Sequence, residues 1–172
     1  QYARLMDLYG VKNELLFRML RYFIRVDNRE EVMALKRRFE ADKSVEVNPV
    51  AYAELGGYML DKGIIEDVQE VLLRAKDAAP RLPEVHYHLS RYFRRMEEYG
   101  NEKEALNATL GNLRNISPLS SERLTLKIDT HRRLGERLYA EEEYLEARAS
   151  YNRGKQTFED ALSRGILERG EP

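Results

Sequence analysis

The chain has no cysteine and no tryptophan, and only 10 glycines and 5 prolines among its 172 residues. The absence of cysteine excludes disulfides and thiolate chemistry. No apolar run approaches the roughly 18 residues that a membrane-spanning helix needs. The chain begins at Gln1, without a methionine and without a signal-type segment, so we expect it to be a piece of a longer protein.

The chain also has no excess of positive or negative charge. The sequence has 29 basic and 30 acidic residues and a formal net charge of −1. The whole molecule therefore has no general attraction for nucleic acid or acidic lipid, and any basic surface must be local. Charged residues make up 34% and hydrophobic residues 42%, and β-branched residues rarely alternate with polar ones. This composition predicts an all-α protein.

Residues 48–80 form the most regular stretch of the sequence. Its first apolar face has helical spacing and consists of Tyr52, Leu55, Gly56 and Met59. After a break at Gly63, a second such face consists of Ile65, Val68, Val71, Leu72 and Ala75, and Pro80 ends it. Two helix axes approach closely only where a side chain is small, as at Gly56. The stretch therefore predicts two packed helices joined by a turn.

This helix pair resembles a tetratricopeptide repeat (TPR). The resemblance rests on Tyr52, Leu55-Gly56, Gly63, Ile65, Val68, Leu72, Ala75 and Pro80, with Val68 in place of the usual small alanine. Members of that family stack helix pairs of about 34 residues, bind other proteins and carry no chemistry of their own. The resemblance implies a right-handed superhelical stack of antiparallel helix pairs, a TPR-like α-solenoid that serves as a protein–protein interaction scaffold.

Looser copies of the unit flank the central one. We expect a single domain over residues 1–172 with units at 13–44, 49–82, 83–118 and 121–162, and the end of a preceding pair at 1–9. In the last unit, Leu134-Gly135 and Ala147 repeat the motif after seven extra residues. Seven residues make about two helical turns, so the first helix of that unit should run from Ser121 to Ala140.

The candidate binding surface is the concave face, which in the repeat family is built from the first helix of each pair. The residues expected there are Phe17, Arg21, Arg25, Tyr87, Arg91, Arg94, Arg95, Arg132 and Tyr139, with Ala53 and Gly57 in the central pair. Our hypothesis is a groove that holds a peptide with acidic and apolar residues through bidentate arginine–carboxylate pairs. In the alternative, the arginines are solvated and pair with Glu97, Glu98 or Glu136.

Two other functions stay open. In the first, the chain is a structural subunit of a large assembly, such as one in a bacterial envelope or motor, and makes its contacts through helix edges and ends. Self-association belongs to this alternative. Residues 50–63 also resemble a pentatricopeptide repeat, which binds RNA. That family needs a hydrogen-bonding side chain where this chain has Ala53, and an electropositive surface.

Motifs for catalysis and metal binding are missing from the sequence. It contains no nucleophile elbow, no phosphate-cradling glycine loop and no HExxH spacing. His86 and His88 lie on roughly opposite sides of a helix, and we expect His86 and His131 to fill the place of Tyr52. We therefore predict no enzyme, no metal, no cofactor, no small-molecule substrate and no membrane insertion, and a protein or peptide as the partner.

Overall fold

The computed structural model describes residues 12–41 and 47–167 of the chain. In these ranges the chain forms helices joined by turns and short connections, without a strand, which confirms the predicted all-α class. The expected end of a preceding helix pair, residues 1–9, lies outside the described residues.

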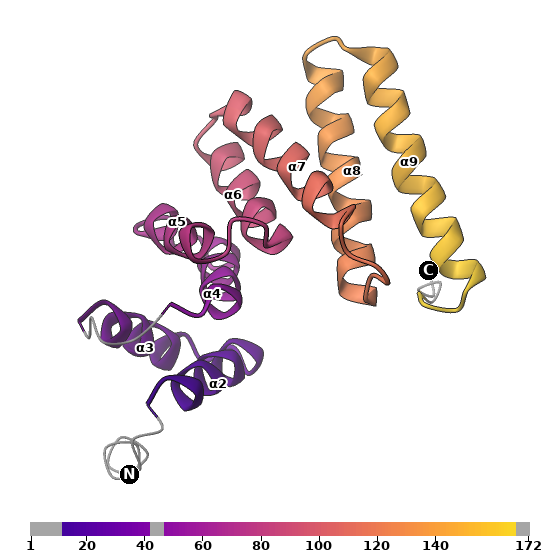
Figure 1. The fold of residues 1–172 in the computed structure, drawn as a ribbon. Coiled ribbons are helices and arrows are strands. Elements are labelled where there is room, and N and C mark those ends of the chain that lie inside the picture. The colour runs from indigo at the N-terminus through magenta and orange to yellow at the C-terminus, as the bar shows by residue number, and fades with distance from the viewer. Residues whose placement is uncertain (1–11, 42–46, 168–172) are drawn as a thin grey trace. The chain divides into compact units, whose positions relative to one another are not determined.

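The helices fall into two compact units, residues 1–80 and 81–172 (Figure 1). The first unit holds α2 (Lys12–Arg25), α3 (Arg29–Ala41), α4 (Pro49–Asp61) and α5 (Val68–Ala78), and the second holds α6 (Pro83–Arg95), α7 (Tyr99–Leu113), α8 (Ser121–Ala140) and α9 (Tyr144–Ser163). Each unit thus contains two of the expected helix pairs. The single domain over residues 1–172 stays a prediction.

In the first unit, α2 packs against α3 and α4, and α4 packs against α5. The rings of Phe17, Phe39 and Tyr52 meet in its core, with centroids 5.3 Å apart between Phe17 and Phe39 and 5.9 Å apart between Phe39 and Tyr52. Phe17 is only 5% exposed, so its assignment to a concave binding surface was wrong. The stripe of α2 that carries Leu16 and Leu20 is wider than the sequence pattern suggested and includes Phe17.

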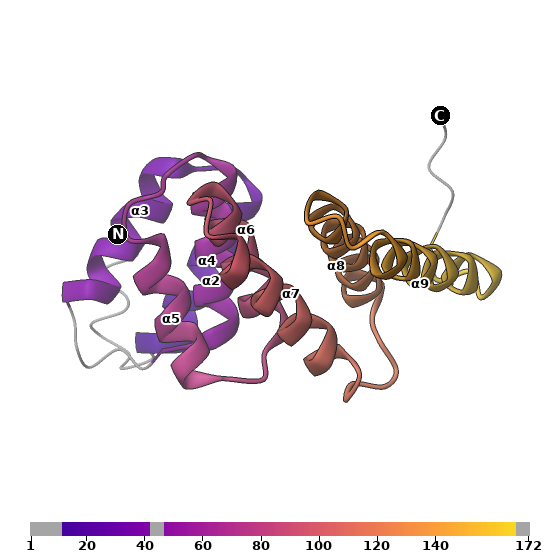
Figure 2. The same ribbon diagram turned by 90° about the horizontal axis from the view of Figure 1, so that it is seen from above.

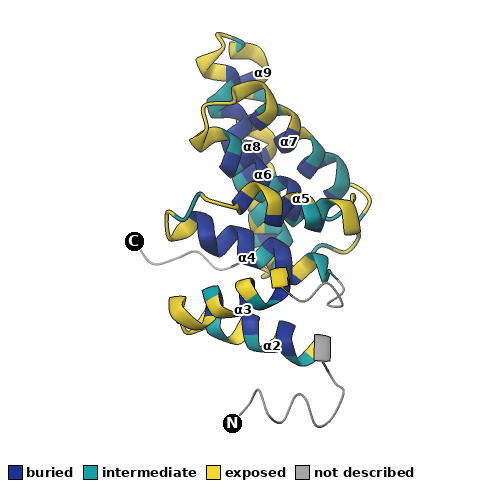
Figure 3. Ribbon diagram, turned by 90° about the vertical axis from the view of Figure 1, so that its left-hand side faces the viewer, coloured by how far each residue is buried: buried dark blue, intermediate teal, exposed yellow. Residues whose placement is uncertain are grey.

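Helix α4 is buried along nearly its whole length (Figure 3). Asn48 accepts a hydrogen bond from the backbone N–H of Ala51 and Pro49 opens the helix, as the cap and proline order of the sequence indicates. Ala53 and Gly57, which were expected on the concave surface, are buried. A helix that lacks an exposed face supplies little binding surface.

Gly56 in α4 allows a close approach of α5. A Cβ atom added at Gly56 would lie 2.7 Å from Cγ of Leu72, which is fully buried. In the second unit, a Cβ at Gly135 in α8 would lie 2.8 Å from the ring of Tyr151 in α9. At both glycines, a large side chain of the partner helix therefore occupies the space that a Cβ atom would take.

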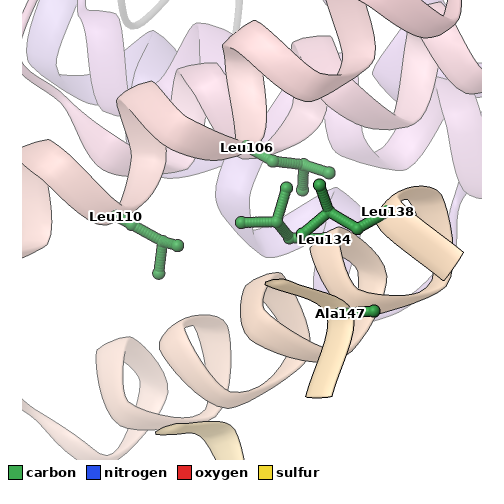
Figure 4. Packing of buried hydrophobic residues seen from close by; sticks show 5 residues of the cluster. All are labelled: Leu106, Leu110, Leu134, Leu138 and Ala147. Carbon is green, nitrogen blue, oxygen red and sulfur yellow. The ribbon is translucent and has the colours of Figure 1, made fainter. Parts of the chain in front are cut away.

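The second unit contains the pairs α6/α7 and α8/α9, and α8 also packs against α6 and α7. Figure 2 shows α8 and α9 side by side, and both are 20 residues long. The bounds of α8 are those expected from the two extra turns in the sequence. Its core cluster joins three helices through Leu106, Leu110, Leu134, Leu138 and Ala147 (Figure 4).

The turn inside each pair has the same backbone form. Its left-handed residue is Asp27, Gly63, Glu97 or Glu142, with φ of 55°, 70°, 59° and 64° in that order. The next N–H in each turn donates to the carbonyl oxygen five residues earlier, as in a Schellman motif: Phe23, Met59, Phe93 and Leu138 are the acceptors. Four pairs that share one turn geometry are typical of repeated units.

Replacement of Gly56 by alanine tests the importance of close helix approach. Because Leu72 is fully buried and has little room to move, Gly56→Ala should lower the free energy of unfolding by about 1–3 kcal/mol. The matched control is Gly111→Ala in α7, where an added Cβ meets nothing within 4 Å. That change should raise the free energy of unfolding by up to about 1 kcal/mol because alanine favours the helix.

The measurement is urea unfolding followed by circular dichroism at 222 nm, on both variants and the unaltered chain. A Gly56→Ala variant as stable as Gly111→Ala would contradict the close approach of α4 and α5.

Candidate functional site

The expected arginines of the first unit lie at the surface of α2. Arg21 donates from Nε to Oε2 of Glu54 in α4 at 2.8 Å, and Arg25 is exposed in the last turn of α2. The contact between Arg21 and Glu54 joins the first helices of two successive pairs. Arg21 therefore has a role within the unit, and Arg25 is the more accessible of the two arginines.

In the second unit, a row of polar contacts joins the first helices of the two pairs, α6 and α8. Glu84 accepts from Nε of Arg123 at 2.8 Å near one end of α6. Farther along α6, the hydroxyl of Tyr87 donates to Oδ2 of Asp129 at 2.6 Å. We call these two contacts, together with the pair between Arg94 and Glu136, the polar seam.

Arg94 continues the seam, since its Nη1 donates to Oε2 of Glu136 at 3.0 Å. Arg132 also pairs with Glu136, and its Nη2 lies 2.5 Å from Oδ1 of Asp129. Burial raises the pKa of Asp129, but the hydrogen bonds from Tyr87 and Arg132 outweigh burial and lower it. Arg94 and Arg132 are thus paired with carboxylates of α8, as the alternative interpretation of the sequence expected for Glu136.

The remaining predicted residues of the second unit lie in different surroundings. Nη1 of Arg91 lies 3.5 Å from Nδ1 of His88 one turn earlier on α6. Tyr139 is 62% exposed near the end of α8, and its ring packs edge-on against Tyr144 with centroids 5.2 Å apart. Arg95 is exposed at the end of α6. Of the nine predicted site residues, Arg25 in the first unit and Arg95 and Tyr139 in the second are therefore well placed to meet a partner.

A pocket of about 300 Å³ opens among α6, α7 and α8, next to the polar seam. We call it the arginine pocket. Its lining consists of Arg94, Arg95, Glu97, Tyr99, Glu102, Arg133, Glu136, Arg137 and Ala140. Four arginines and three glutamates face each other there, so most of the positive charge is already balanced.

A buried ion pair forms the inner wall of the arginine pocket. Glu102 in α7 and Arg133 in α8 are 2% and 6% exposed, and Nη2 of Arg133 lies 3.6 Å from Oε1 of Glu102. This Oε1 atom has no hydrogen-bond partner among the described residues. Burial raises the pKa of Glu102, and the nearby charges of Arg133, Arg94 and Arg137 only partly oppose the shift. The pocket therefore contains an acceptor atom that a bound group with an N–H or O–H can satisfy.

Arg137 forms a second wall of the pocket. Its guanidinium lies 4.0 Å from the centre of the Tyr99 ring, and its Nε is 3.8 Å from Oε1 of Glu141. The buried Nε of Arg137 has no hydrogen-bond partner among the described residues. The arginine pocket thus contains both an unsatisfied donor and an unsatisfied acceptor, which suits a polar group more than an apolar one.

Glu102, Arg133, Tyr99 and Arg137 were not among the residues predicted from the sequence. Glu102 had a detectable pattern, because it lies at helical spacing from the buried residues Ala105, Leu106 and Thr109. A carboxylate on an apolar helix face predicts either a buried partner or a site. Arg133 and Arg137 had no comparable pattern, since arginines are frequent throughout α8.

The described residues contain neither a candidate metal site nor a candidate membrane span. Within residues 12–41 and 47–167, no three acidic or histidine side chains gather in a way that would hold a metal ion. None of the helices described there combines the length and hydropathy that membrane crossing requires. No protein-family model and no curated protein matches the chain, so its resemblance to known repeats rests on its own residues.

The raised pKa of Glu102 predicts a pH-dependent stability. Between the ordinary value of 4.5 and the raised value, the folded chain binds more protons than the unfolded chain, so stability falls as pH rises through this window. Glu102→Gln removes this dependence. The free energy of unfolding of Glu102→Gln, relative to the unaltered chain, should therefore increase from pH 4 to pH 7, as measured by urea unfolding at a series of pH values.

Glu104→Gln is the matched control, because Glu104 is exposed on the same helix. Its stability relative to the unaltered chain should stay nearly constant over the same range. If the relative stability of Glu102→Gln decreased as pH rose, attraction to Arg133 would outweigh the cost of burial.

Proposed function

We propose that the chain is a non-enzymatic interaction module of the tetratricopeptide-repeat kind. In this proposal its helix pairs stack into a right-handed superhelix, and Arg95 in the lining of the arginine pocket pairs with an acidic side chain from a peptide or partner protein. The partner's neighbouring apolar residues contact the exposed aromatic residues nearby.

Support for the repeat class comes from the packing within the pairs. Gly56 and Gly135 hold equivalent places in the sequence motif, and each lies against a large side chain of the following helix, Leu72 or Tyr151. Ala147, the small residue of the last unit, is 1% exposed. His86 and His131 are 8% and 6% exposed, in keeping with the buried aromatic place expected for them.

The proposed function rests on one observation, the exposure of Arg95 without an ion pair among the described residues. This arginine lines the arginine pocket and is exposed, and within the described part of the chain it makes no ion pair. Arg94 and Arg133, by contrast, already contact Glu136 and Glu102. Arg95 is therefore available for a bidentate pair with an incoming carboxylate, which adds both affinity and orientation.

An exposed apolar patch at the turn between α8 and α9 favours a second function, assembly through the ends of the helices. Tyr139, Tyr144 and Leu145 are 62%, 55% and 79% exposed there. Large apolar side chains in such an exposed cluster are typical of contact surfaces. The RNA-binding alternative is not proposed, because Ala53, at the position that would read a base, is 1% exposed.

Selection from a random peptide library tests the proposed function. Peptides selected on the full chain should be enriched in acidic and apolar residues. Arg95→Glu should weaken their binding at least about tenfold, because it replaces attraction by repulsion at the pocket. Arg148→Glu, an equal charge reversal at an exposed position of α9, is the control and should change affinity less than about twofold. Fluorescence polarisation measures both.

If both variants lost the same affinity, the change in net charge alone would explain the loss, and the arginine pocket would not be involved. Binding that persists in Arg95→Glu, with helicity retained, would remove the arginine pocket from the proposed function.

The assembly alternative has its own test. Leu145→Glu places a charge in the exposed patch without altering the core, since Leu145 is 79% exposed. If the chain self-associates through this patch, light scattering should show a dimer or larger species that Leu145→Glu converts to monomer. A monomeric unaltered chain over the same concentration range would contradict self-association.

A further inference from the structure

A second pocket, of about 290 Å³, lies among α7, α8 and α9, within the second unit. Its lining consists of Leu110, Arg114, Lys127, His131, Arg153, Gln156, Thr157 and Asp160. We call it the cationic pocket. It shares none of its lining residues with the arginine pocket, and none of them belongs to the predicted concave surface.

The length of the last two helices accounts for this pocket. Helix α7 has 15 residues and is capped at Arg114, whereas α8 and α9 have 20 residues each. Close approach of α8 and α9 is maintained beside the pocket, since a Cβ at Gly154 would lie 3.1 Å from Cβ of His131. The pocket is therefore built on packed helices, with Leu110 from the core cluster in its lining.

Positive charge in the cationic pocket is largely unbalanced. Arg114, Lys127 and Arg153 come from three different helical segments, and Asp160 is the one acidic residue in the lining. Among the described residues, none of the three cations lies within ion-pair distance of a carboxylate. In the arginine pocket, by comparison, Arg94 and Arg133 each contact a glutamate. Three cations that converge without acidic partners suit an anion of more than one charge.

His131 in the pocket lining experiences this positive field. It is 6% exposed, and its Nδ1 lies 3.4 Å from Oγ of Ser150. Burial, together with the charges of Lys127, Arg153 and Arg114, lowers the pKa of His131 to about 4. The same three cations that line the pocket therefore act on the buried imidazole of His131.

We propose that the cationic pocket binds a phosphate group, as free phosphate or as a phosphomonoester. Phosphoserine carries about −1.5 to −2 charges at pH 7, which matches the excess of three cations over one carboxylate. Arginine guanidinium groups such as those of Arg114 and Arg153 pair with phosphate oxygens in a bidentate manner. The volume of about 290 Å³ leaves room for the group that carries the phosphate. This inference is independent of the proposed partner binding at Arg95.

The experiment is a titration of the full chain, followed by ¹⁵N NMR of backbone and arginine Nε groups at constant ionic strength. The probes are inorganic phosphate, O-phosphoserine and serine at pH 7. Phosphate and phosphoserine should give saturable shifts at the lining residues, and serine should give none. Tighter binding of phosphoserine than of phosphate would identify a phosphomonoester as the ligand, and the reverse order would identify free phosphate.

Variants distinguish a built site from general attraction. Arg114→Gln and Arg153→Gln should each weaken binding about fivefold or more, because each removes a bidentate contact. Asp160→Asn should tighten binding, since it removes the carboxylate that repels the anion. Arg148→Gln, an exposed position on α9 outside the lining, is the control and should leave affinity nearly unchanged.

His131 supplies a further readout. Sulfate stays a dianion at pH 4, so its binding should raise the pKa of His131 above about 4 by offsetting Lys127, Arg153 and Arg114. Asp160 is the acidic residue of the lining, and its negative charge acts on His131 in the same direction. Shifts that do not saturate, equal effects of Arg148→Gln and Arg153→Gln, or no gain for Asp160→Asn would each overturn the proposal.

Discussion

Close approach of the two helices within a pair is the constraint on which the structure depends. At Gly56 the approach is closer than a methyl group allows, and Leu72 fills the space that a side chain would take. The same arrangement recurs at Gly135 with Tyr151. Once these contacts fix the distance between the helices, the remaining apolar residues of the pair can reach one another and form a core.

The regular features of the fold were predictable from the sequence because they depend on neighbours along the chain. Helical spacing of apolar residues, the Asn48-Pro49 start and the length of α8, Ser121–Ala140, are all local properties, and the structure agrees with each. Phe17 was assigned to the wrong side because aromatic residues suit both a core and a binding surface. Its burial depends on Phe39 and Tyr52, which belong to other helices.

The candidate site was less predictable, because its geometry depends on contacts between helices. Tyr87 and Asp129 are 42 positions apart, as are Arg94 and Glu136. Spacing along one helix identifies which residues share a face, but it does not say which opposite charge the next helix presents. The predicted arginines lie on α2, α6 and α8, and only the structure shows which of them pair with carboxylates. Glu102 lies at helical spacing from buried residues of its own helix, but its partner, Arg133, lies on another helix and could be identified only from the structure.

The two pockets of the second unit differ chiefly in how their charges are balanced. In the arginine pocket, Glu136 and Glu102 pair with Arg94 and Arg133, so the proposed ligand would gain affinity chiefly at Arg95. In the cationic pocket, Asp160 faces three cations, and a buried histidine is held neutral beside them. Unbalanced cations repel one another, and folding must overcome that repulsion. Binding of an anion relieves this repulsion and should stabilise the packing of α7 against the α8/α9 pair. An anion should therefore stabilise the second unit more by binding in the cationic pocket than by binding in the arginine pocket.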